Sequence, residues 1–139
     1  MVRHISLFLL SLLFCSGCNT NPQMNDIINN QYEDIKAYSD QNAIYVGEWV
    51  GDQETKLWPI KIGKDGKVLM CVAKKGHSNV NGKVYIENGE TFIIYEGGTR
   101  YKIISVDKEI MNLDFYGDEF KYYAGTVPDK CLESFKNFE

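Results

Sequence analysis

Few residues of this 139-residue chain have side chains of the kind that catalysis requires. Of the two histidines, His77 lies in a polar, turn-prone stretch at residues 74–79 (KKGHSN). Its neighbour Ser78 does not make a nucleophile with it, because a nucleophile and its base must face each other. Neither a three- or four-ligand zinc pattern nor an EF-hand or phosphate-binding glycine loop is present in the sequence. We predict a protein that is not an enzyme and has no catalytic residues, metal or cofactor, with His77 in a surface loop.

The remaining reactive side chains are cysteines, and the first two, Cys15 and Cys18, lie at the end of an N-terminal leader. Arg3 precedes residues 5–14 (ISLFLLSLLF), which are apolar apart from two serines. Ten residues are too few for a transmembrane helix, which needs about 20, but suit the apolar centre of a secretory signal. The pattern predicts an exported chain.

Residues 16–18 (Ser-Gly-Cys) resemble the end of bacterial lipoprotein signals, in which a small residue and Gly or Ala precede the lipidated cysteine. The resemblance implies that residues 1–17 are removed and that Cys18 is acylated and attached to the bilayer. Cys15 stands where this family usually has Leu. Asn19, rather than Asp, follows Cys18, which by resemblance to sorted lipoproteins implies the outer membrane. An ordinary signal peptide that leaves a secreted protein is the alternative.

With Cys15 removed and Cys18 lipidated, Cys71 and Cys131 remain. An even pair in an oxidising compartment predicts a disulfide. That bond closes a loop of about 60 residues, which the chain-entropy model values at about 4 kcal/mol. Two separate buried thiols are the alternative.

From residue 44 onward, short segments rich in Val, Ile, Tyr and Phe alternate with Asn-Gly, Asp-Gly and Gly-Gly turn signals. The segments are 44–50, 56–62, 67–73, 83–87, 91–95, 100–106, 110–116 and 119–123. The series predicts an all-β domain over residues 44–139, an antiparallel meander of about eight strands that forms a small barrel or a sandwich. Pro59 cannot donate to a ladder, so the second segment is predicted to be an edge strand or bulged.

Segments of different character flank the predicted sheet. Residues 18–43 are predicted to be a lipidated tether with a possible short helix, and a flexible spacer is the alternative. The helix is suggested by the spacing of Ile28, Tyr32, Ile35 and Tyr38. The tail after Pro128 predicts one or two helical turns, with Leu132 and Phe135 on one side and Cys131 joined to the third strand.

Gly47-Glu48-Trp49 resembles the Gly-x-Trp motif of lipocalins, in which the Trp closes the barrel end against an arginine. The resemblance implies a carrier of a small apolar ligand. Arg100, however, lies in the sixth segment rather than in the last. Small eight-stranded barrels are filled by their own side chains, so we predict that Trp49 and Trp58 belong to the core.

Residues 97–101 (Gly-Gly-Thr-Arg-Tyr) resemble the Ser-Gly-x-x-Tyr segment of C-type lysozyme inhibitors, which are small disulfide-linked barrels and often lipoproteins. Gly98 and Tyr101 match, and Gly97 replaces the Ser. The resemblance implies that Arg100 offers its guanidinium group to the catalytic carboxylates of the target. A Gly-Gly hairpin with a strand arginine is the plainer interpretation.

The composition limits the possible partners. With 15 Lys and Arg against 19 Asp and Glu, the chain lacks the basic excess of a general nucleic-acid binder. Nine tyrosines suit a protein interface, but they equally suit a small barrel that needs bulk. We expect a non-catalytic binding module on the outer membrane, held to the lipid bilayer and binding a protein or another envelope component. Lysozyme inhibition and lipocalin-like transport are the alternatives.

Overall fold

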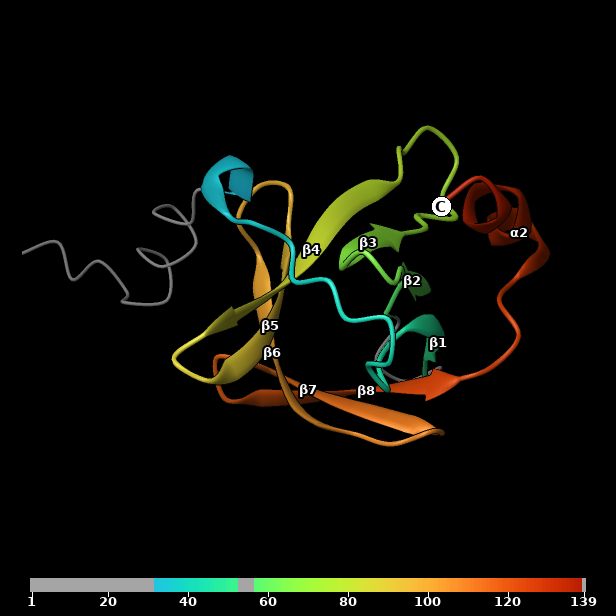
Figure 1. The fold of residues 1–139 in the computed structure, drawn as a ribbon. Helices are drawn as coiled ribbons and strands as arrows, with labels where there is room; N and C mark the ends of the chain where they lie inside the picture. The colour runs from blue at the N-terminus through green and yellow to red at the C-terminus, as the bar shows by residue number, and fades with distance from the viewer. Residues whose placement is uncertain (1–31, 53–56, 139) are drawn as a thin grey trace, which may run out of the picture.

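A computed structural model of the chain describes residues 32–52 and 57–138 (Figure 1). The strands are β1 (Gly47–Gly51), β2 (Ile60–Ile62), β3 (Lys67–Met70), β4 (Val80–Glu87), β5 (Glu90–Tyr95), β6 (Arg100–Val106), β7 (Ile110–Phe115) and β8 (Asp118–Ala124). Each pairs antiparallel with the next, and β8 pairs with β1, so the sheet is a closed barrel. The all-β meander is confirmed, and the barrel replaces the sandwich. Cys18 and the leader lie outside the described residues.

Closure leaves β2 with a partner on each side, because it pairs with both β1 and β3. The prediction that Pro59 marks an edge strand is therefore wrong. Pro59 lies just before β2, where its missing N–H removes no ladder bond. Its carbonyl instead accepts a hydrogen bond from the Cys71 N–H at 2.9 Å.

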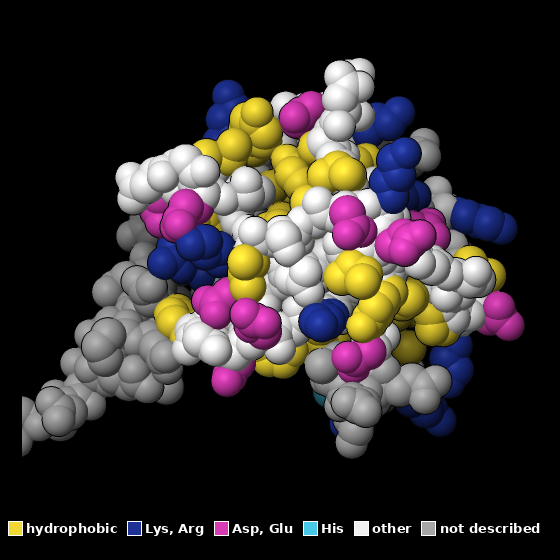
Figure 2. Space-filling view, turned by 90° about the horizontal axis from the view of Figure 1, so that it is seen from below, with side chains coloured by type: hydrophobic (Ala, Val, Ile, Leu, Met, Phe, Trp, Pro, Cys, Tyr) yellow, Lys and Arg dark blue, Asp and Glu magenta, His cyan; other side chains and the backbone are white. Residues whose placement is uncertain are grey.

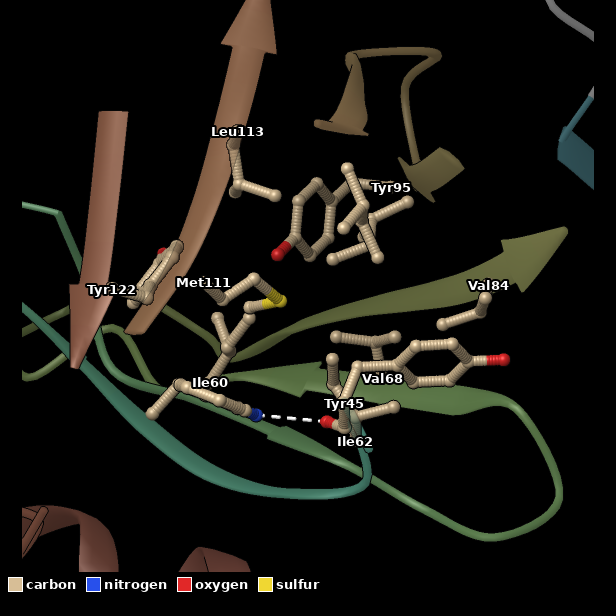
Figure 3. Packing of buried hydrophobic residues seen from close by; sticks show 12 residues of the cluster. Tyr45, Ile60, Ile62, Val68, Val84, Tyr95, Met111, Leu113 and Tyr122 are labelled. Carbon is tan, nitrogen blue, oxygen red and sulfur yellow. Dashed lines mark hydrogen bonds between the residues drawn. The ribbon is translucent and has the colours of Figure 1, made fainter. Parts of the chain in front are cut away.

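The interior of the barrel is filled by side chains that converge from the surrounding strands (Figure 3). They are Tyr45, Trp49, Ile60, Ile62, Val68, Val84, Ile93, Tyr95, Ile103, Met111, Leu113 and Tyr122. Trp49 is 2% exposed, and its indole N–H donates to the Tyr45 carbonyl at 2.8 Å. The core prediction is confirmed for Trp49 and wrong for Trp58, which precedes β2 and is 37% exposed.

The helix α2 (Asp129–Lys136) covers part of the outer wall (Figure 1). Its Cys131 and Phe135 form a cluster with Leu69 of β3, and Cys131 is bonded to Cys71, as predicted. Leu132 and Phe135, predicted to lie on one side, differ in burial, since Phe135 is 1% exposed and Leu132 is 38% exposed. Residues four apart lie on one helix face, so the buried stripe is Cys131 with Phe135. No helix among the described residues is long and apolar enough to cross a bilayer.

The N-terminal flank also lies against the barrel, but it is not the helix that the spacing suggests. Among the described residues of this flank, Tyr32–Asp34 form a short 3-10 helix, η1, and residues 35–46, here called the strap, run across the barrel without helical structure (Figure 1). The Tyr38 N–H donates to the Val84 carbonyl at 2.7 Å, so this backbone bonds to the barrel wall instead of within a helix. Ile28, also part of the predicted stripe, lies outside the described residues.

Tyr32 and Ile35 pack against an outer cluster of Tyr85, Phe92 and Ile94. As a result β5 is buried on both faces over residues 92–95. Gly66 permits the close approach of the strap, because a Cβ there would lie 2.2 Å from the Tyr38 carbonyl oxygen.

The disulfide should stabilise the barrel with α2 as one unit. It joins residues 60 apart in sequence, so replacing both Cys71 and Cys131 with Ala should lower the free energy of unfolding by about 4 kcal/mol. Denaturant unfolding with and without reductant measures the difference. Reductant should destabilise the unsubstituted chain and leave the double variant unchanged. Equal unfolding midpoints for the oxidised and reduced chain would contradict the expectation.

The buried tyrosines should make the protein sensitive to alkaline pH. Burial raises the pKa of Tyr95, Tyr101 and Tyr122 above the ordinary value of 10.0. The unfolded chain loses these protons first, so the free energy of unfolding should fall as pH rises above 10, by up to about 1.4 kcal/mol per tyrosine and pH unit. Thermal melts between pH 9 and 12 measure this slope. Tyr95→Phe should make it shallower, and Tyr123→Phe, which alters an exposed side chain, should not.

Candidate functional site

The three predicted partner-binding residues lie at the β5–β6 turn and the start of β6. The Gly98 N–H donates to the Tyr95 carbonyl at 2.9 Å and so closes the turn. Arg100 and Tyr101 follow as adjacent strand residues, and adjacent side chains point to opposite faces of a sheet. The structure therefore does not bring the two side chains together on one surface.

Arg100 lies on the outer wall and is already engaged there. Its Nη1 donates to the Tyr85 hydroxyl at 3.1 Å and to Glu87 at 3.1 Å. The guanidinium also lies 5.0 Å from the centre of the Phe92 ring, which favours a cation–π contact. An external carboxylate would have to compete with Glu87 for this group.

Tyr101 belongs to the barrel interior. Its ring centre lies 5.0 Å from that of Phe115, and it meets Tyr95 and Phe120 edge-on at 6.1 Å. Tyr101 thus serves the core in this structure. Tyr95 and Tyr122 also fill the interior.

The lipocalin-like Trp49 bonds to Tyr45 rather than closing against an arginine. Arg100 contacts Tyr85 and Glu87 of β4 and Phe92 of β5. His77 is exposed in the β3–β4 loop, as predicted. Within residues 32–52 and 57–138, no group of three or more His, Cys, Asp or Glu side chains is arranged to hold a metal ion.

Two adjoining hollows lie on the outer wall, and the sequence reasoning did not anticipate them. The first, here called the groove, has a volume of about 540 Å³ and lies between the β2–β3 hairpin, the start of β1 and the C-terminal tail. The second has a volume of about 310 Å³ and is bordered by η1, the strap and β4. They share Lys67 and Phe138. The groove is lined chiefly by Val46, Lys61, Lys64, Asp65, Lys67 and Phe138.

Lysines outnumber carboxylates in the groove by three to one. Lys61 Nζ donates to the Phe135 carbonyl at 2.7 Å, and Lys67 Nζ lies 2.9 Å from an Asp65 carboxylate oxygen. Desolvation raises the pKa of Asp65, but hydrogen bonds from the Lys67 side chain and backbone outweigh it, so the net pKa is lowered. Asp65 is therefore ionised at neutral pH and offsets one of the three positive charges. The sequence signal was the lysine spacing around the turn, KIGKDGK at residues 61–67.

The second hollow has a different electrostatic character. Its Lys83 Nζ donates to the carbonyls of Tyr32 and Ile35, at 2.8 and 3.0 Å, and lies 4.1 Å from the centre of the Tyr32 ring. Glu33 and Glu96 also line it. Lys83 thus holds the N-terminal flank on the barrel. In the second hollow two lysines, Lys67 and Lys83, are matched by two carboxylates, so of the two hollows it is the groove that has an excess of positive charge.

Comparisons with protein-family models, with curated proteins and with solved structures find no match to this chain. What can be inferred about its function comes from its residues and their geometry.

Proposed function

We propose that the protein is a lipid-anchored, non-catalytic binding module of the bacterial outer membrane, held there by acyl chains on Cys18. One observation carries the binding role: the barrel interior is filled by its own side chains, whereas both hollows lie on the outer wall. A ligand or partner therefore has its space on the outside. The lipoprotein-like leader supports the location.

The anchor would keep the barrel close to the bilayer. Acyl chains contribute about 0.8 kcal/mol for each buried methylene, and stable attachment needs more than one chain. Residues 19–31 connect Cys18 to Tyr32, the first described residue, and a segment of this length spans at most about 50 Å. The partners of an anchored barrel would thus be molecules found at or near the membrane surface.

The character of the surface agrees with a protein or lipid partner. Figure 2 shows one face of the molecule, on which hydrophobic side chains lie among both acidic and basic ones. The net charge of −4 opposes a polyanionic nucleic-acid partner. Mixed surfaces of this kind suit contacts with protein or with an amphipathic envelope component.

The anchoring half of the proposal is tested by Cys18→Ala. The variant should lose acyl labelling and move from the membrane to the soluble fraction, because no acyl chain would remain to hold it. Metabolic labelling with an alkynyl fatty acid, followed by fractionation, measures both properties. Cys15→Ala is the matched control, since the cleaved leader would carry Cys15 away, and this variant should stay labelled and membrane-bound.

Membrane attachment of Cys18→Ala at the level of the unsubstituted chain would refute the anchor. An exported protein that keeps its leader and shows no mass gain from acyl groups would refute it as well.

A further inference from the structure

We infer that the groove binds a small amphipathic anion, with one carboxylate or phosphate head on an alkyl chain. This inference deepens the proposed function and rests on it only for the setting, a membrane surface where such amphiphiles occur. The argument for binding itself comes from the shape, the lining and the charge of the groove.

The groove offers an apolar surface and a volume that suit a small molecule. Its volume of about 540 Å³ falls within the usual range of small-molecule sites, roughly 300–1,000 Å³. Val46 and Phe138 supply apolar walls, and a Cβ added at Gly63 would lie 3.7 Å from Phe138 Cε1. A Cβ added at Gly47 would meet nothing within 4 Å, so the groove is open above that backbone. The methylene stems of the lysines add further apolar surface.

The charged side chains of the groove favour a ligand with an anionic head. Lys61 uses one N–H on the Phe135 carbonyl, which leaves two donors on its ammonium group. The Lys67–Asp65 pair is exposed, with 66% and 48% of the side chains accessible, so an incoming anion can compete for Lys67 at little cost. The lining has no arginine, whose fork would select a planar bidentate group. The three lysine ammonium groups are point charges, which require only that the head of the ligand be negative.

A polypeptide fits this place less well. Peptides often bind by adding a strand to a sheet edge, but β2 and β3 beneath the groove each have partners on both sides. The C-terminal tail and the start of β1 also border the groove. A compact ligand with one alkyl chain matches these limits.

The test is photo-crosslinking of the purified full chain, with the Cys71–Cys131 bond oxidised, by a diazirine-bearing analogue of laurate. Mass spectrometry locates the crosslinks, and unlabelled laurate, dodecyl phosphate and 1-dodecanol serve as competitors. Crosslinks should fall on the segments that carry Val46 and Phe138. Laurate or dodecyl phosphate should compete at least fivefold better than the neutral alcohol, and the better of the two identifies the source as a fatty acid or a phospholipid. Raising the salt from 0.05 to 0.5 M should weaken both anions.

Lys64→Gln with Lys67→Gln should raise the half-maximal laurate concentration about fivefold or more, because two exposed charges are lost from the site. Lys108→Gln with Lys121→Gln removes the same charge from exposed positions elsewhere and should change it less than twofold. All four substitutions are at exposed lysines, and equal thermal midpoints verify that the variants fold.

Three results would overturn the assignment: equal competition by 1-dodecanol, equal weakening in the two double variants, or crosslinks confined to another part of the chain. None of these results depends on Cys18, so failure of the anchor and failure of the groove are seen separately.

Discussion

The pairing of β1 with β8 is the constraint on which the rest of the structure depends. Joining the first strand to the last gives every strand two partners and leaves no edge to protect. Closure also turns one face of each strand inward, where aromatic and branched side chains fill the space. A barrel of this size has no room for both a packed core and a ligand. The proposed binding therefore has its space on the outer wall.

The outer wall carries apolar residues that closure alone does not bury. Leu69 of β3 is covered by α2, and Phe92 and Ile94 of β5 are covered by the N-terminal flank. The two ends of the described chain therefore complete the hydrophobic burial of its middle. The groove lies between these two covers, since Val46 of the strap borders it on one side and the C-terminal tail on the other. The position of the groove therefore depends on the segments that cover the outer wall, rather than on the strands of the barrel alone.

Much of the sheet could be predicted from sequence, because turn signals and strand propensity act locally. The turns at Asp65-Gly66 and Asn88-Gly89 and the alternation at Met111 and Leu113 locate the strands to within a few residues. Asn81-Gly82 was predicted to be a turn in the same way, but it lies inside β4, paired with β3. Features that depend on distant contacts were not predictable in this way. The spacing of Tyr32, Ile35 and Tyr38 has a helical period, yet the bond from Tyr38 to Val84 prevails.

The same distinction separates the site residues. Cysteine number, with the predicted oxidising compartment, was enough to predict the pairing of Cys71 with Cys131. The short match around Gly98 could not show that Arg100 pairs with Glu87 on one face while Tyr101 enters the core on the other. The lysines of the groove are visible in the sequence, but the groove that they line has a wall formed by Phe138, which lies about 70 residues further along the chain. Only the folded tail brings it there.

The attachment of the strap has a mechanical consequence. A pull on Tyr32 from its N-terminal side meets the contacts of Lys83 with Tyr32 and Ile35, and then the Tyr38–Val84 hydrogen bond, before it reaches Tyr45 and β1. These contacts would break one after another, while the strand ladders of the barrel carry no load. The strap thus protects the barrel from a force applied at this end of the described chain.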